Sequence, residues 1–249
     1  MNISQNTYDQ FAEEQNRLIS SVSKPDRDSV FLVYDMVLPR LLEFAGDVSG
    51  LTVLDAGCGE GYVSRILAER RAIVTGIEIS PRLVELAHSK PVKGNVDYFV
   101  HDLSEPLPDY EDAFDLVVSN MVIMDVPDYR GFISTLGAIT RVSGRVILSM
   151  HNPYRSVLKK RVTDYFDSDE VSMYQDMAKN GGIETYYFHR TLEEYVTAFR
   201  DQGFLLRSLS DVKPSEEIIS KCEGPKIWEC VHFPFFQILE FIKEKTQAT

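Results

Sequence analysis

The chain has 249 residues, of which 44% are hydrophobic and 26% charged, so it is long enough to bury the core of one large α/β domain. Its formal net charge of −12 and its lack of a long Lys/Arg cluster argue against binding to nucleic acid through phosphate groups and, more weakly, against an anionic membrane. The sequence shows no secretion signal and no run of roughly 18 apolar residues, which predicts a cytoplasmic protein without a transmembrane segment. It has only three cysteines, Cys58, Cys222 and Cys230, which predicts a reduced protein without a metal site.

The first 150 residues predict helices and then a regular alternation of strands and helices. Apolar runs bounded by turn residues predict strands, and apolar residues at helical spacing predict helices. Ser80 suits the cap of one of these helices and Pro81 its first position. Helices are expected before residue 50, most strongly over 30–45, followed by strands over 52–57, 72–78, 96–102, 114–120 and 144–150 and helices over 62–71, 82–90 and 129–140.

Strands that alternate with helices indicate βαβ crossovers, and therefore a parallel sheet with helices on both faces. Residues 151–190 interrupt this rhythm. They predict an insertion without a convincing strand, which would serve as a lid or substrate wall; the alternative is that it only extends the core. The aromatic residues of the insertion stand at positions 154, 165, 166, 174, 186, 187 and 188.

The last sixty residues predict one more helix and two strands. Thr191 and Glu194 have the spacing of a capping box at the start of this helix, and Gly203 ends it. Strands over 204–210 and 235–243, with no helix between them, predict an antiparallel hairpin at the edge of the sheet. The expected fold is a doubly wound, Rossmann-like α/β domain with a mostly parallel seven-stranded sheet. It spans residues 1–249 as a single domain, with N-terminal helices (1–50), a cofactor-binding core (51–150), the insertion (151–190), and the last helix with the edge hairpin (191–249).

A glycine-rich turn follows the first predicted strand. Gly57, Gly59 and Gly61 fall at the sheet edge where doubly wound folds bind their ligands. Glycine lets the backbone turn sharply, point N–H groups at a ligand and admit a close approach. Glu78 ends the second strand, where a carboxylate can accept both hydroxyls of a ribose.

The glycine spacing distinguishes two classes of cofactor. Dinucleotide-binding folds show G-x-G-x-x-G facing a pyrophosphate, whereas this chain has G-x-G-x-G with Asp55 two residues before it. A carboxylate at that position suits a cationic amino-acid moiety better than an anionic pyrophosphate. The residues therefore predict a nucleoside ligand that carries a positive charge.

Four motifs together resemble a known family. The stretches "VLDAGCGEG", "GIEIS", "VHDL" and "FDLVVSNMVIMDV" are similar to the class I S-adenosylmethionine-dependent methyltransferases. The resemblance is greatest to their small-molecule branch of the ubiquinone and menaquinone type, which includes quinone-biosynthesis C-methyltransferases. It implies S-adenosylmethionine as cofactor, S-adenosylhomocysteine as product and a small molecule as methyl acceptor. No nucleic acid or membrane partner is expected, and the protein would be a monomer or a homodimer.

The same resemblance implies the cofactor contacts. The methionine portion would be held by Asp55 and by the backbone of Gly57, Cys58, Gly59 and Gly61, and its far end would be lined by Asn120 and Met121. Glu78 would bind the ribose hydroxyls, and Asp102 would accept a hydrogen bond from the adenine amino group. The adenine ring would lie beside Ile79 and Leu103, and Tyr8 would close over the cofactor. Asp102 could instead be a plain cap at a strand end, and Tyr8 could only pack on the sheet.

Three side chains are candidates for acid–base chemistry. His151 ends the fifth predicted strand, and its near-neutral pKa would suit the deprotonation of a phenol or an amide-like nitrogen. His189 stands beside Arg190 after the insertion; a histidine in either position also often caps backbone or lies half-exposed. Asp125 follows the fourth strand, where many relatives carry a histidine. The remaining histidines, His88, His101 and His232, are expected to be structural.

The acceptor is expected to be a small, ring-containing metabolite methylated on oxygen, nitrogen or carbon. Aromatic residues in the insertion suit a flat acceptor. The sequence "SNMV" stands where enzymes that methylate nucleic-acid nitrogens carry Asn/Asp-Pro-Pro-Tyr/Phe. Three alternatives stay open: an enzyme of the same fold that catalyses a cyclisation or other non-methylating reaction, a module that senses S-adenosylmethionine, and a nicotinamide dehydrogenase, which the glycine spacing and Asp55 disfavour.

Overall fold

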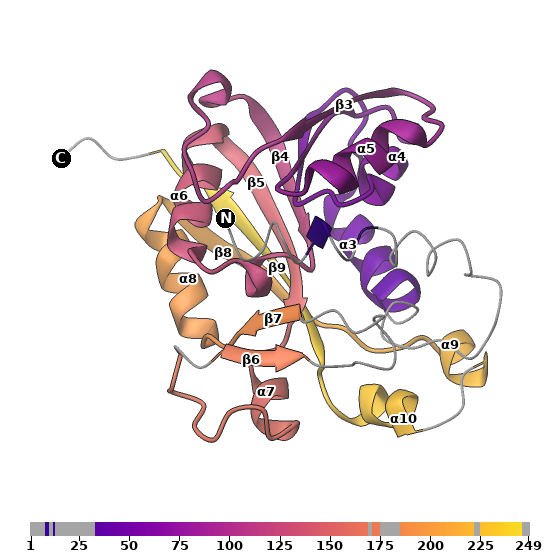
Figure 1. Ribbon diagram of the computed structural model, residues 1–249, viewed down its shortest axis with the longest axis vertical. Helices are drawn as coiled ribbons and strands as arrows, with labels where there is room; N and C mark the ends of the chain where they lie inside the picture. The colour runs from indigo at the N-terminus through magenta and orange to yellow at the C-terminus, as the bar shows by residue number, and fades with distance from the viewer. Residues whose placement is uncertain are drawn as a thin grey trace.

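A seven-stranded sheet runs through the centre of the molecule (Figure 1). The computed structural model describes residues 8, 9, 12, 33–168, 171–174, 185–221 and 225–245. Neighbouring strands are parallel, except that β9 pairs antiparallel with both β5 and β8, which confirms the predicted fold. In spatial order the strands are β3 (Asn95–Val100), β2 (Ile73–Glu78), β1 (Thr52–Ala56), β4 (Phe114–Asn120), β5 (Thr140–His151), β9 (Phe236–Lys243) and β8 (Phe204–Asp211).

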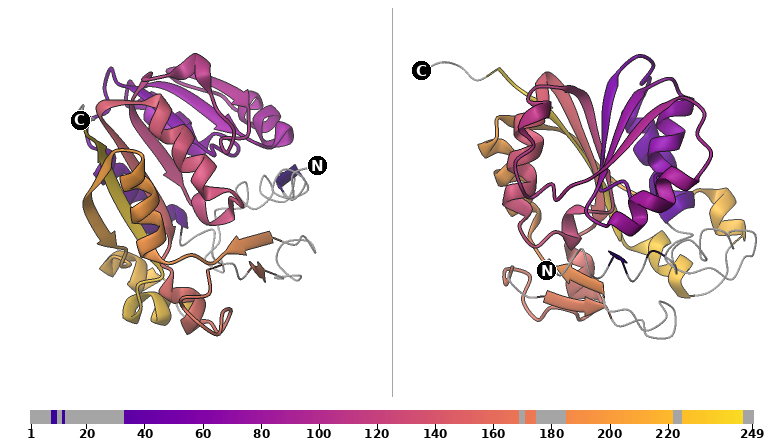
Figure 2. Two further views of the ribbon diagram at one scale, coloured as in Figure 1. Left: turned by 90° about the vertical axis from the view of Figure 1, so that its left-hand side faces the viewer. Right: turned by 45° about the horizontal axis from the view of Figure 1, so that its top comes forward.

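Helices cover both faces of this sheet (Figure 2). Val53 of β1 packs in the core with α3 and α4, whereas its neighbour Leu54 packs in the core with α6 and α8. Alternate side chains of one strand are thus buried in the two cores on opposite faces of the sheet. Because both faces are buried, the strands are continuous apolar runs. None of the helices in the described ranges is long and apolar enough to cross a membrane. The helices are α3 (Leu38–Ala45), α4 (Tyr62–Glu69), α5 (Pro81–Ser89), α6 (Tyr129–Ile139) and α8 (Leu192–Asp201), with a 3-10 turn η2 (Pro108–Tyr110) before β4 and another, η3 (Ile123–Asp125), after it.

Two predicted helix caps are confirmed. The Ser80 hydroxyl oxygen accepts the Leu83 N–H at 3.2 Å, at the start of α5. Thr191 and Glu194 form both halves of the capping box of α8. These caps satisfy N–H groups that have no partner inside the helix, so they fix where each helix begins.

The insertion contains secondary structure that the sequence analysis missed. Helix α7 (Tyr154–Leu158) is followed by β6 (Val171–Tyr174) and β7 (Thr185–Phe188), which pair antiparallel as a separate two-stranded ribbon. The expectation of no strand was therefore wrong. Each strand has only four residues, too few for a periodicity to be read, although β-branched and aromatic residues favour strands in both.

The connection between the last two strands was also misread. It contains α9 (Glu216–Lys221) and α10 (Pro225–His232), so the expectation of no helix was wrong, although the antiparallel pairing of β8 and β9 is correct. Ser215 accepts the Ile218 N–H at 3.3 Å and caps α9, and Pro225 begins α10. These start signals were available in the sequence.

Two other boundaries differ from the prediction. The helix expected over 30–45 is a π-helix, η1 (Val33–Val37), followed by α3, because Pro39 has no N–H to donate and its ring clashes with the carbonyl four residues earlier. Helix α6 runs directly into β5 at Thr140, so that strand begins four residues earlier than expected.

The functional edge of the sheet is the one where β1, β2, β4 and β5 end. The β6–β7 ribbon lies at this edge, next to the end of β5 (Figures 1 and 2). There the ring of Tyr187 in β7 lies 5.6 Å from that of His151, the last residue of β5. Because β9 runs antiparallel, it begins at the same edge, with Phe236 paired to His151.

Candidate functional site

The glycine loop is a tight turn that is hydrogen-bonded to β2. Gly57, Gly59 and Gly61 all have positive φ angles (77°, 56° and 79°), a conformation that other residues rarely adopt. The N–H groups of Gly57 and Cys58 donate to the Ile77 carbonyl at 2.8 and 3.0 Å. A Cβ atom on Gly57 would lie 2.5 Å from Val122, whereas one on Gly59 would meet no atom of the described residues within 4 Å. The loop is therefore packed on the Val122 side and open above Gly59.

This difference predicts two distinct phenotypes. Gly59→Ala should cost about 1–2 kcal/mol of unfolding free energy for its left-handed backbone, and its methyl group should block a ligand that approaches the loop. Gly57→Ala should cost a further 1–3 kcal/mol, roughly, because Val122 must move. Urea denaturation and calorimetric titration with S-adenosylhomocysteine measure both effects. Equal stability of the two variants would contradict the packing of Val122 on the loop.

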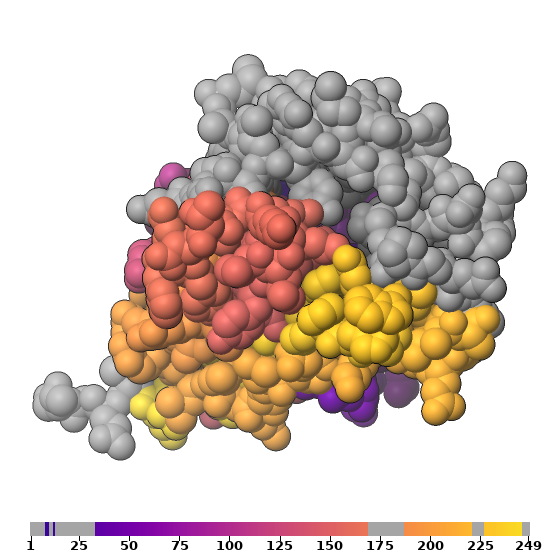
Figure 3. Space-filling view, turned by 90° about the horizontal axis from the view of Figure 1, so that it is seen from below, coloured from indigo at the N-terminus to yellow at the C-terminus, as the bar shows by residue number. Residues whose placement is uncertain are grey.

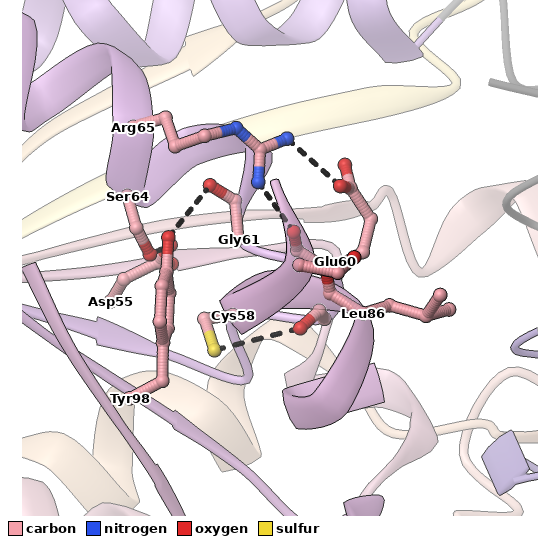
Figure 4. Close-up of polar contacts among 10 residues, drawn as sticks. Asp55, Cys58, Glu60, Gly61, Ser64, Arg65, Leu86 and Tyr98 are labelled. Carbon is pink, nitrogen blue, oxygen red and sulfur yellow. Dashed lines mark hydrogen bonds and ion pairs between the residues drawn. The ribbon is translucent and has the colours of Figure 1, made fainter. Parts of the chain in front are cut away.

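Asp55 lies under the loop at the end of β1 and is almost fully buried. Its Oδ2 accepts the Ser64 hydroxyl at 2.5 Å, from the first turn of α4 (Figure 4). Its Oδ1 is buried and has no hydrogen-bond partner among the described residues. Burial, opposed by the bond from Ser64, raises the pKa of Asp55 to about 7. A buried acceptor without a donor fits a ligand that brings a cation to this point.

Glu78 is fixed at the other side of the loop. Its Oε2 accepts the Gly59 N–H at 3.0 Å and its Oε1 accepts the Ser80 N–H at 3.1 Å. Burial raises the pKa of Glu78, and the hydrogen bonds from the Ser80 and Gly59 backbone oppose that rise. Each carboxylate oxygen can accept a second hydrogen bond, so the group is oriented to receive two hydroxyls.

The other predicted cofactor residues lie around the same edge. Cys58 is buried, its Sγ lies 3.7 Å from the Gly59 carbonyl, and burial raises the pKa of its thiol. Asn120 accepts the Ser149 hydroxyl at 2.6 Å, and Met121 has a left-handed backbone whose N–H donates to the Ser149 carbonyl at 3.0 Å. Ser149 thus holds the loop after β4 to β5.

The adenine side has fewer fixed contacts. Ile79 is half-buried and Leu103 is buried. Asp102 Oδ1 accepts the Ser104 N–H at 3.0 Å and the Ser104 hydroxyl at 2.6 Å, so this side chain does cap the turn after β3. Its role toward an adenine amino group stays a prediction.

Tyr8 and Asp125 meet although 117 residues separate them. The Tyr8 hydroxyl donates to Asp125 Oδ2 at 2.5 Å. Burial raises the pKa of Asp125 to about 7, while the Tyr8 hydrogen bond and the charge of Arg190 lower it. Burial, with the charge of Asp125, raises the pKa of Tyr8. The pair stands after β4, beside the opening of the glycine loop.

His151 is an uncharged histidine among aromatic rings. Burial, then the charges of Arg155 and Arg161, hold its pKa well below the usual value. Its ring centroid lies 5.6 Å from that of Tyr187 and 5.3 Å from that of Phe236. Its Nδ1 is buried and has no hydrogen-bond partner among the residues that the structure describes. The low pKa keeps the imidazole neutral at neutral pH, so a ring nitrogen is available as a hydrogen-bond acceptor, and it also makes the ring a weaker base than a free histidine.

His189 has different surroundings. Its side chain is fully buried, and its Nε2 lies 2.9 Å from the Tyr165 carbonyl, which fixes Nε2 as the donor. It ties the chain after β7 to the loop after α7. A catalytic role for His189 stays a prediction, as do those of Asp125 and His151, and the His189 ring is already bonded to a backbone carbonyl.

Sequence reasoning missed several residues of this site. Ser64 orients Asp55, and Asp9 accepts the Ser80 hydroxyl at 2.5 Å; Arg190 was noted only as a neighbour of His189, and its hydrogen bond to the Pro127 carbonyl at 2.7 Å was not foreseen. Ser64 could have been found, because it stands three residues after Gly61 in the first turn of a predicted helix. The other two contacts join distant segments. In the described ranges no group of His, Cys, Asp and Glu side chains could hold a metal ion.

Comparisons with known proteins agree with this geometry. A family model described as a methyltransferase domain matches residues 31–209. The chain is 33% identical over 107 residues to a ubiquinone biosynthesis O-methyltransferase of Coxiella burnetii, over 42% of this chain and 45% of that protein. It is 31% identical over 155 residues to the protein of that name in Xanthomonas oryzae pv. oryzae, over 61% and 63%. The matches thus span less than two thirds of these relatives.

A solved structure shows the same fold. The S-adenosylmethionine-dependent methyltransferase of Mesorhizobium loti superposes with a TM-score of 0.68 at 22% identity, over 82% of this chain and 96% of that one. This structural match covers more of the chain than the sequence matches to the Coxiella and Xanthomonas proteins do.

Proposed function

The chain belongs to the class I S-adenosylmethionine-dependent methyltransferases, and we propose that it methylates a hydroxyl oxygen on a small, ring-containing acceptor. The family sets the cofactor. The hydroxyl and the ring are our own inference, and the observation that carries them is the uncharged His151 among aromatic rings at the cofactor edge of the sheet.

The residues around the glycine loop fit the cofactor. Asp55 offers a buried oxygen to the amino group of its methionine portion, and Glu78 offers two oriented oxygens to the ribose hydroxyls. The open space above Gly59 admits a close approach. When bound, S-adenosylmethionine supplies a methyl group on a positively charged sulfur, which an aligned nucleophile can take by in-line displacement.

His151 would act as the general base. A hydroxyl is a weak nucleophile unless its proton is removed, and a base in hydrogen-bond reach accelerates such a step by about 100- to 10,000-fold. Because the pKa of His151 lies well below its usual value, the imidazole stays neutral at physiological pH, so its unbonded Nδ1 is in the form that can accept a hydrogen bond from the acceptor hydroxyl. Proton transfer to it would then accompany methyl transfer, when the hydroxyl becomes far more acidic.

One observation supports a ring in the acceptor and another supports oxygen as the methylated atom. Tyr187 and Phe236 flank His151, and aromatic faces pack well on a flat ring. The relatives from Coxiella and Xanthomonas carry the name of O-methyltransferases of ubiquinone biosynthesis, which supports oxygen as the methylated atom.

The test is a methyl-transfer assay with a labelled methyl group on S-adenosylmethionine and a panel of hydroxylated aromatic compounds. A labelled O-methyl product, formed in equal amount with S-adenosylhomocysteine, is expected. A label on carbon or nitrogen would contradict the hydroxyl acceptor. Conversion of an acceptor without S-adenosylhomocysteine would favour a non-methylating reaction, and binding without any conversion would favour a sensing module.

A further inference from the structure

Two adjacent residues bridge the opening of the glycine loop. Tyr8 donates to Asp125 at 2.5 Å, after β4, and Asp9 accepts the Ser80 hydroxyl at 2.5 Å and the Arg82 N–H at 3.4 Å, after β2. In the sheet β1 lies between β2 and β4. Because the glycine loop follows β1, Tyr8 and Asp9 span from one side of that loop to the other.

Asp125 also lies on the acceptor side of the site. It is the last residue of η3. Arg190 donates to the carbonyl of the first residue of this turn, Ile123, at 3.4 Å, and to the carbonyl of Pro127, two residues after the turn, at 2.7 Å. The guanidinium of Arg190 lies 4.3 Å from the centroid of the Tyr129 ring. Arg190 is 5% exposed, so its charge acts on Asp125 in surroundings with little water.

The same turn touches the wall beside His151. Strand β7 packs against η3, and its Tyr187 carries the ring that faces His151. Burial raises the pKa of Tyr187 and of Tyr195, and the negative charge of Asp125 adds a smaller contribution to both rises. Asp125 therefore accepts a hydrogen bond from Tyr8 on one side, and on the other side its charge acts on Tyr187 of β7.

We propose that Asp125 is a positioning residue that couples the two halves of the site: a cofactor bound beneath Tyr8 and Asp9 orders residues 185–190, the acceptor wall, through Asp125 and Arg190. The proposal rests on cofactor binding at the glycine loop, as the proposed function does, but not on which atom is methylated.

The coupling has a thermodynamic consequence. Ordering the wall costs conformational entropy, and if the cofactor has already ordered it, the acceptor binds without that cost. Linkage makes the effect reciprocal, so an acceptor also tightens cofactor binding. The enzyme would then bind its cofactor first and its acceptor second.

The experiment is amide hydrogen exchange of the full chain with and without saturating S-adenosylhomocysteine. It compares the wild type with Tyr8→Phe, which removes one hydroxyl, and Asp125→Asn, which removes one charge. Tyr110→Phe is the matched control, since Tyr110 is half-buried and stacks on Phe114 away from this edge. Calorimetry confirms saturation, and Tyr8→Phe should raise the Kd about tenfold, the loss of one hydrogen bond to a charged group.

In the wild type and in Tyr110→Phe, the ligand should slow exchange both at residues 57–61 and at 185–190. In Tyr8→Phe and Asp125→Asn it should still slow exchange at 57–61 but no longer at 185–190. A merely structural role would speed exchange with and without ligand alike, leaving the difference intact. Protection at 185–190 that persists in both variants would overturn the proposal, as would wild-type protection confined to 57–61. Absence of protection at 57–61 itself would overturn the cofactor site as well.

Discussion

Replacing His151 with asparagine is expected to lower kcat about 100-fold or more while leaving the Kd for S-adenosylhomocysteine within about twofold of the wild type. The imidazole would remove the proton of the acceptor hydroxyl, and asparagine cannot accept it. Cofactor affinity should persist because Asp55, Glu78 and the glycine loop are separate from His151. Steady-state kinetics with the acceptor found by screening, and calorimetry for the cofactor, provide the two measurements.

His232→Asn is the matched control for this substitution. His232 is exposed, and its Nδ1 bonds the Trp228 carbonyl within α10, so its loss should change neither quantity. The pH profile adds an independent check. Because the pKa of His151 lies well below its usual value, kcat measured at saturating cofactor should not fall on acidification from pH 8 to 6.5 through protonation of this group. Unchanged kcat in His151→Asn would remove the histidine from the reaction.

Replacing Asp55 with asparagine is expected to weaken S-adenosylhomocysteine binding about 10- to 100-fold, the usual effect of losing a hydrogen bond to a charged group. In the wild type the affinity should also depend on pH. The carboxyl group has a pKa of about 7 without ligand, and only its ionised form attracts a cation. Affinity should therefore rise with pH up to about 7 and then level off, whereas Asp55→Asn should lack this rise.

The same residue should affect stability in the opposite direction. Its folded-state pKa of about 7 lies above the ordinary value, so the folded protein holds a proton that the unfolded chain has lost. The contribution of Asp55 to stability is thus present at low pH and falls by about 1.4 kcal/mol per pH unit between roughly pH 4 and 7. Asp55→Asn should remove this share of the slope, leave the similar share that arises from Asp125, and unfold at a higher temperature than the wild type at pH 8.

Exposed Asp97 provides the control, since Asp97→Asn should alter neither binding nor the pH slope. A variant of Asp55 that binds S-adenosylhomocysteine as tightly as the wild type would show that the cofactor does not use this carboxylate. If Asp55→Asn were less stable than the wild type at pH 8, the buried negative charge of Asp55 would not be what lowers the stability of the wild type at that pH.

The parts of the fold that depend on neighbouring residues could be predicted. The glycine loop needs only a strand, a turn and a helix in succession, so Asp55 and Glu78 were assigned to one edge from the sequence. The caps of α5 and α8 could be predicted for the same reason, because the capping side chain and the backbone N–H group that it binds are only three residues apart in the sequence.

The missed features depend on distant segments or on very short ones. Tyr8 and Asp125 are 117 residues apart, and no local pattern links a tyrosine to a carboxylate at that separation. Strands β6 and β7 pair only with each other, and four residues give no usable period. His151 was correctly placed at a strand end, but its low pKa arises from burial and from Arg155 and Arg161, which only the folded chain brings near it.

The reversed direction of β9 has a practical consequence. This strand begins opposite His151 and, after eight residues and about 26 Å, ends opposite Phe204 of β8, at the far edge of the sheet. A fluorophore or surface tether placed at Lys243 would therefore stand well away from the reaction, whereas one placed at Tyr8 would crowd the opening of the glycine loop. Immobilised assays of this enzyme should use the C-terminal attachment.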